Sequence, residues 1–94
     1  MTMNWQVVYK PTFLKELAKL PAKIRTRVET LAFKTMAEAT NPYSVPGVEK
    51  LEGFREYYKV TLGDYRVGIR LDKQSKVIEF CRVLHRRDLY RYFP

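Results

Sequence analysis

The chain has 94 residues, and 18 Lys and Arg against 10 Asp and Glu give a formal net charge of +8. This length supports one hydrophobic core and excludes two, so a single domain over residues 1–94 is expected. No stretch is long and apolar enough to span a bilayer, and residues 1–10 lack the pattern of a signal peptide. One cysteine, Cys81, excludes an internal disulfide, so a reducing, cytoplasmic location is expected.

The positive charge is concentrated in the second half of the chain. Residues 1–54 carry a net charge of +3, and the shorter segment 55–94 carries +5. Seven of the nine arginines lie in that second segment, and arginine grips phosphate with a planar fork of donors. An excess of this kind attracts phosphates, acidic proteins or anionic lipids, and an ordinary solvated surface is the alternative.

The first 39 residues predict a strand and two helices. Trp5–Tyr9 is aromatic and β-branched, which is typical of a strand. A helix is then expected from Pro11, since apolar residues recur at helical spacing up to Leu20. Pro21 breaks the pattern, and a second amphipathic helix is expected to continue to about Ala39. Two such helices with a tight break form a helical hairpin.

The remainder of the chain predicts strands. The segment 40–53 carries turn signals and is expected to be a loop. In residues 65–72, apolar residues alternate with Arg66, Gly68, Arg70 and Asp72, which indicates a half-buried strand with one basic face. The other expected elements are a strand over 56–62, a turn at Gly63-Asp64, a turn over 72–76, a strand over 77–84, and a short polar and aromatic segment over 85–92.

The resulting order, β-α-α-β-β-β, predicts an α+β fold. The last three strands are sequential, so an antiparallel meander is the economical arrangement. Both helices must bury their apolar stripes on one face of this sheet. The opposite face is expected to stay open and to carry Arg66 and Arg70, two positions apart on one strand.

Familiar site chemistries find little support in the sequence. There is no glycine-rich phosphate loop, no paired carboxylates suited to acid–base work, and no Cys/His cluster with metal spacing, so neither a cofactor nor a metal is expected. Cys81 and His85 could share a strand face as a nucleophilic pair, but Cys81 lies in an apolar run typical of a core cysteine. What remains is a basic and aromatic set, which is either a nucleic-acid site or a solvated basic edge: Lys59, Arg66, Arg70, Arg82, His85, Arg86, Arg87, Tyr90 and Arg91.

Four segments of the chain resemble the RelE/ParE superfamily of toxins from type II toxin–antitoxin systems. They occur in the family's order and extend over nearly the whole chain. The segments are LAKLP (17–21), KLEGFREYYKV (50–60), GDYRV (63–67) and RVLHRRDLY (82–90).

The resemblance implies a RelE-like fold, β-α-α-β-β-β(-α), in which an antiparallel sheet carries a helical hairpin on one face. It also implies neutralisation by a cognate antitoxin in a hetero-oligomer. RelE-like members cut mRNA in the ribosomal A site without a metal. In that reaction the 2′-hydroxyl attacks the adjacent phosphate and leaves a 2′,3′-cyclic end and a 5′-hydroxyl. ParE-like members share the fold but poison DNA gyrase, and a non-catalytic RNA-binding relative is a third possibility.

The resemblance also implies roles for individual residues. Lys59 matches a base or charge stabiliser, Arg66 a phosphate-holding arginine, and Arg86 an arginine that acts on the leaving group or transition state. Tyr90 matches a tyrosine that stacks on or orients a base, and His85 is a second acid–base candidate because it titrates in the useful range. Two features depart from the best-studied relatives: Thr61 stands where a second lysine is usual, and Arg86 and Tyr90 are more closely spaced. Further RNA contacts are expected from Arg70, Arg82, Arg87 and Arg91.

Overall fold

The computed structural model describes residues 5–94. None of the helices within these residues is long and apolar enough to cross a membrane. The elements in chain order are β1 (Gln6–Tyr9), α1 (Pro11–Ala18), α2 (Ala22–Thr30), the π-helix η1 (Leu31–Thr35), α3 (Met36–Glu38), the 3₁₀ helix η2 (Pro42–Ser44), β2 (Val48–Lys50), β3 (Tyr57–Leu62), β4 (Tyr65–Asp72), β5 (Val77–His85) and α4 (Leu89–Tyr92).

The strands form one five-stranded sheet in the order β1-β5-β4-β3-β2. The predicted antiparallel meander of β3, β4 and β5 is confirmed. Two expectations were wrong. The sheet is mixed, because β1 pairs with β5 in parallel, a direction that a strand's own residues do not encode. The predicted loop over 40–53 contains β2, a three-residue edge strand that pairs with β3 and is too short to give a periodic signal.

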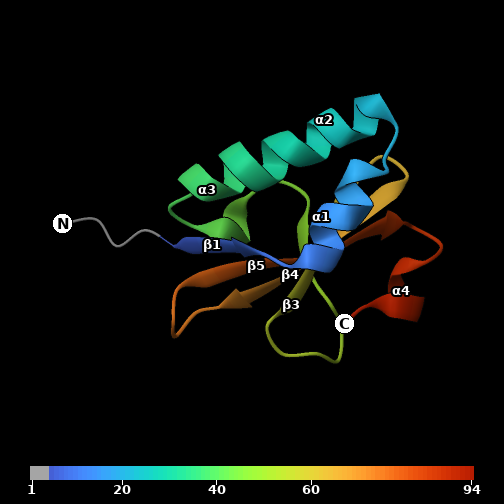
Figure 1. Ribbon diagram of the computed structural model, residues 1–94. Coiled ribbons are helices and arrows are strands. Elements are labelled where there is room, and N and C mark those ends of the chain that lie inside the picture. Colours follow the sequence, from blue (N-terminus) through green and yellow to red (C-terminus); the bar gives the residue numbers. More distant parts are fainter. Residues whose placement is uncertain (1–4) are drawn as a thin grey trace.

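The predicted helical hairpin covers one face of the sheet, which we call the helix face (Figure 1). Pro11 occupies the first turn of α1, and Pro21 caps α2, so each proline starts a helix. The second helical segment runs without interruption through α2, η1 and α3 to Glu38. The helices bury Phe13, Val28 and Met36 against the sheet. Their partners from the strands are Val60, Val67, Ile69, Leu71, Ile78, Phe80 and Val83.

A β-bulge interrupts the pairing of β4 with β5. Gly68 pairs with Arg82 and Ile69 pairs with Phe80, so Cys81 is the extra residue on β5. The bulge lets both Phe80 and Val83 face the helices although they are three positions apart, because the inserted residue resets the alternation. Cys81 instead joins a second cluster of buried residues, and this cluster lies away from the helix core.

The opposite face of the sheet, the second face, is partly covered, and the expectation that it stays open was wrong. Leu51, Cys81, Leu89 and Phe93 form a separate buried cluster there. Figure 1 shows α4 on the side of the sheet away from α1 and α2. The cover forms because Gly68 at the centre of β4 has no side chain, and the ring of Phe93 occupies the space above it.

Candidate nucleic-acid interface

Lys59 and Tyr90 meet on the second face, although 31 positions separate them in the chain. Lys59 lies on β3 directly opposite Gly68 of β4. Its Nζ donates a hydrogen bond to the Tyr90 hydroxyl. The Nζ lies 5.1 Å from the centroid of the Tyr90 ring, which matches approach along the C–O bond at the rim of the ring. The lysine therefore holds the hydroxyl and leaves both ring faces free, and Tyr90 is 65% exposed.

Arg66 lies on the same face, one step along the sheet. It pairs with Thr61 of β3, so its Cα is a diagonal neighbour of Lys59, at roughly 7–8 Å. Its guanidinium donates to the carbonyl oxygens of Gly63 and Tyr65 at 2.9 and 3.0 Å. Within residues 5–94, no carboxylate lies within ion-pair distance of Arg66. Most of its donors are thus available to an anion.

Arg86 directly follows β5 and is bound to the hairpin turn at Gly63-Asp64, at the same end of the sheet as Arg66. Its backbone N–H donates to the Asp64 carbonyl at 2.8 Å. Its Nε lies 4.0 Å from Asp64 Oδ1, and the two side chains are 64% and 70% exposed. A contact this long and this exposed contributes little energy. The turn therefore gathers two arginines, Arg66 and Arg86, whose charges remain largely unpaired.

His85 is not brought together with Lys59 or Arg66. It pairs with Tyr65, and their rings meet edge to face with centroids 5.5 Å apart. Side chains alternate along a strand, so Tyr65 and His85 lie on the helix-face side while Arg66 lies on the second face. The Nδ1 of His85 accepts from the Arg87 backbone N–H at 3.3 Å, which leaves Nε2 as the ring's free nitrogen.

Arg70 and Arg82, which were expected to contact RNA, are both held in ion pairs. Arg70 contacts Glu79, Glu56 and Asp72 at 3.1, 3.4 and 3.5 Å. Its pKa is raised, chiefly by the hydrogen bond to Glu79. An arginine that faces three carboxylates is neutralised locally and has few donors left for phosphate.

Arg82 is anchored to the first helix. Its Nη2 and Nε donate to Glu16 at 2.6 and 3.0 Å, and the backbone N–H of Val83 donates to the same carboxylate at 3.0 Å. The Glu16 hydrogen bond is the main cause that raises the pKa of Arg82. By contrast, Arg87 and Arg91 are exposed and form no ion pair within residues 5–94.

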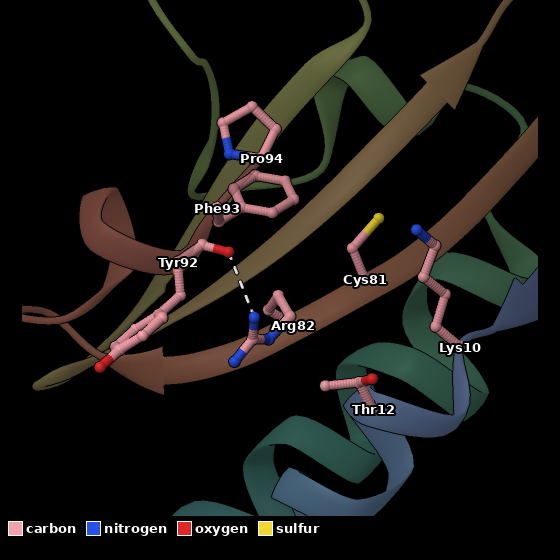
Figure 2. A pocket seen from close by; sticks show the side chains of 7 residues that line it. All are labelled: Lys10, Thr12, Cys81, Arg82, Tyr92, Phe93 and Pro94. Atoms are coloured by element: carbon pink, nitrogen blue, oxygen red, sulfur yellow. Dashed lines mark hydrogen bonds between the residues drawn. The ribbon is translucent and has the colours of Figure 1, made fainter.

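Cys81 and His85 do not form the nucleophilic pair that the sequence left open. Burial, followed by the charge of Glu79, raises the pKa of its thiol to about 12. The bulge places Cys81 on the second face, whereas His85 lies toward the helix face, so the two side chains cannot act together. The thiol forms a wall of a small pocket of about 220 Å³ between β5, the start of α1 and the Phe93 segment (Figure 2). No group of three metal-binding side chains occurs in the part of the chain that the structure describes.

The sequence reading missed two contributors to this surface. One is the Asp64 carbonyl, which fixes Arg86 through a backbone hydrogen bond and therefore leaves no trace in residue type. The other is Glu16, the single acidic residue of α1. A lone carboxylate on an otherwise basic or apolar helix is a signal that could have indicated a structural partner among the later arginines.

Comparison with known proteins identifies the class to which this fold and surface belong. The sequence matches the family described as the ParE toxin of type II toxin–antitoxin systems over residues 7–90. The chain belongs to this toxin family, and it is RelE-like.

Three relatives support that assignment. Toxin RelE3 of Methanocaldococcus jannaschii is 34% identical over 93 residues, which is 95% of this chain and 99% of the relative. The RelB–RelE antitoxin–toxin complex from Methanococcus jannaschii contains a chain with 32% identity and a TM-score of 0.76, with 93% and 99% of the two chains covered. The archaeal RelE–RelB complex from Pyrococcus horikoshii gives 28% identity and a TM-score of 0.71, covering 89% and 97%.

Proposed function

We propose that this toxin is an endoribonuclease that cuts mRNA on the ribosome and so stops translation in the cytoplasm. The observation that carries the proposal is a set of three cations: Lys59 and Arg66 on the second face, and Arg86 at the Gly63-Asp64 turn next to Arg66. Lys59 and Arg66 have no carboxylate within ion-pair distance among residues 5–94, and Arg86 has one weak contact. Unpaired cations on a rigid sheet form a site for a phosphate that gains charge.

The reaction is an attack of the 2′-oxygen on the adjacent phosphorus. The bond to the 5′-oxygen breaks, a proton leaves the 2′-hydroxyl, and a proton is added to the 5′-oxygen. Arg66 and Arg86, on two sides of the same turn, hold the phosphate and stabilise the crowded intermediate. No metal takes part in this scheme.

Lys59 and Tyr90 complete the surface. Lys59 donates to Tyr90, and as an ammonium it has two further donors to offset phosphate charge. Both faces of the Tyr90 ring are free to stack on a base, which is a common mode of recognising single-stranded RNA. The exposed Arg87 and Arg91 are proposed to contact the backbone nearby. Arg70 and Arg82 are assigned to structure because carboxylates occupy their guanidinium groups.

The decisive experiment is primer extension on an mRNA in a translating extract to which the purified protein is added. Cuts spaced by codons are expected. Arg66→Ala and Arg86→Ala should each lower the cleavage rate by about 100-fold, as loss of one stabilising donor does in other enzymes, and should leave the unfolding temperature unchanged. Arg25→Ala removes the same charge from α2 and is the matched control. Absence of cuts, with translation intact, would sink the proposal.

Gyrase poisoning is the second candidate, because the matching family is described by its ParE member. The arrangement of Lys59, Arg66 and Arg86 favours RNA, and the named relative is a RelE toxin. A supercoiling assay separates the two targets. Inhibited gyrase with intact mRNA would reverse the ranking, and normal growth on induction without an antitoxin would favour a non-catalytic relative.

A cognate antitoxin is part of the proposal. The similar chains from Methanococcus jannaschii and Pyrococcus horikoshii were solved as complexes with RelB. In this chain, two grooves of about 490 and 380 Å³ flank α2, and Arg27 lines both. Both grooves combine apolar walls with the positive charge of Arg27, and this combination suits an acidic segment that folds on binding. Co-purification of the toxin with its antitoxin, and relief of growth arrest, test this partner.

A further inference from the structure

The ring of Phe93 rests directly on the backbone of Gly68. A Cβ added at Gly68 would lie 2.9 Å from each of three ring carbons of Phe93, which is closer than packed carbon atoms approach. Phe93 is 5% exposed although it lies outside the helix core. Glycine at this position therefore creates a seat of the size and shape of one aromatic ring.

The seat is one of several anchors on a short segment. Leu89, at the start of α4, is fully buried, and the Phe93 N–H donates to the Leu89 carbonyl at 2.8 Å. The Phe93 ring also meets Tyr57 edge to face, with centroids 5.5 Å apart. Figure 2 shows Arg82 donating to the Tyr92 carbonyl, at 3.2 Å. Residues 89–93 are thus fixed at both ends.

Tyr90 lies between these two fixed ends, and within residues 5–94 its side chain has one hydrogen-bond partner, Lys59. Lys59 in turn stands directly opposite Gly68 in the sheet. The seat of Phe93 and the residue that Tyr90 must reach are therefore cross-strand neighbours on the same face. A shift of the Phe93 ring would carry α4 with it and would move the Tyr90 hydroxyl away from Lys59.

We propose that Phe93 and Gly68 are positioning residues for the RNA site: the ring seated on glycine holds Tyr90 in contact with Lys59. This inference rests on the proposed function, because it assigns Lys59 and Tyr90 to the reaction. Neither Phe93 nor Gly68 touches the substrate. They act through Tyr90, and a role limited to packing would show itself as lost stability alone.

The first test is a double-mutant cycle in the mRNA cleavage assay. Phe93→Leu and Gly68→Ala should each lower kcat by about 10- to 100-fold, the range expected for a misplaced group. Phe93→Leu combined with Tyr90→Ala should be no slower than Tyr90→Ala alone, since both changes remove the same contact. Phe13→Leu, in the helix core, is the matched control: it lowers the unfolding temperature and leaves kcat within about two-fold of wild type.

Two kinetic results would overturn the inference. In the first, kcat of the Phe93→Leu/Tyr90→Ala double variant falls by the product of the two single-variant factors. The other is a fall in kcat for Phe13→Leu as large as that for Phe93→Leu at equal loss of unfolding temperature, because the effect would then follow stability and not position.

The second test needs no activity. Nuclear Overhauser contacts between the Lys59 ε-methylene and the Tyr90 ring protons are expected in the free wild-type protein and in Phe13→Leu. They should vanish in Phe93→Leu and in Gly68→Ala. Contacts that persist in Phe93→Leu would refute the positioning role, whatever the cleavage result. A wild-type protein that shows the contacts and their loss in Phe93→Leu, yet cuts no mRNA, would support the seat and refute the proposed function.

Discussion

Replacing Glu16 with alanine should destabilise the protein by about 2 kcal/mol. The Glu16 carboxylate accepts from two guanidinium nitrogens of Arg82 and from the Val83 backbone N–H. The side chains of Arg82 and Glu16 are 25% and 21% exposed, so the pair lies between two limits. Exposed pairs contribute roughly 0.2–1 kcal/mol, and breaking a buried pair costs roughly 3–5 kcal/mol.

The assay is thermal unfolding followed by circular dichroism at neutral pH. For a domain of this size, 1 kcal/mol corresponds to a shift of about 4–8 °C, so Glu16→Ala should lower Tm by about 8–16 °C. Glu16→Gln keeps an acceptor for Val83 and loses only the charge, so about half of that shift is expected. Glu38→Ala, an exposed position, is the control and should stay within about 0.5 kcal/mol of wild type.

A double-mutant cycle with Arg82→Ala isolates the pair. The two single changes should couple by about 1–2 kcal/mol, because each removes the same contact. The reasoning is refuted if Glu16→Ala unfolds within about 2 °C of wild type, or if the two effects are additive. Arg82 also donates to the Tyr92 carbonyl, which helps to fix the Tyr90 segment. An Arg82→Ala variant that folds normally and keeps the Lys59–Tyr90 contact, but loses RNA cleavage, would therefore restore the original expectation that Arg82 contacts RNA.

Two further predictions follow from buried groups. The Cys81 thiol, with its pKa raised to about 12, should resist iodoacetamide at pH 8 in the folded protein and react on unfolding; rapid native labelling would contradict this. The pKa of the Cys81 thiol is higher in the folded protein than its unfolded value of about 8.5. The protonated thiol therefore contributes fully to stability below about pH 8.5, and this contribution declines as the pH rises toward 12. Tyr9→Phe removes the 2.7 Å hydrogen bond that the Tyr9 hydroxyl donates to the Ala32 carbonyl. The free energy of unfolding, measured in urea, should fall by about 1 kcal/mol. An unchanged urea midpoint would show that water replaces the hydroxyl.

The elements with a regular period could be predicted from the sequence. The alternation in β4 assigned Val67, Ile69 and Leu71 to the helix face and Arg66 and Arg70 to the second face, as the structure has them. Successive side chains of a strand point to opposite faces, so a strand with one buried face alternates apolar and polar residues in its sequence. The helical hairpin was predictable for the same reason, because its apolar residues recur at helical spacing and prolines mark both starts.

Features that depend on one residue or on the backbone could not be predicted. The bulge at Cys81 adds one residue to β5 and reverses the faces beyond it, so His85 lies away from Arg66. The cover over the second face depends on the missing side chain of Gly68. The alternation places this glycine inside a strand, but it does not indicate that Phe93, 25 positions later, packs over it. The charge of Arg82 was read as free because its partner Glu16 lies 66 positions away in the chain. The partners of Arg70 are close, since Asp72 is on the same strand and Glu79 is its cross-strand neighbour, but the strand register that brings them together was not predicted.

The two hairpin turns of the meander differ in how much change they can tolerate. The turn at Gly63-Asp64 connects β3 to β4 in two residues, and the Asp64 carbonyl also holds the Arg86 N–H. Burial of Val67, Ile69 and Leu71 fixes the register of β4, so one inserted residue there would distort the turn and displace the Asp64 carbonyl from the Arg86 N–H. The turn between β4 and β5, at residues 73–76, lies at the opposite end of these strands and is mostly exposed. A peptide tag or a dye for tracking the toxin therefore belongs in the second turn. An insertion in the first turn is expected to lower the activity of the protein without unfolding it.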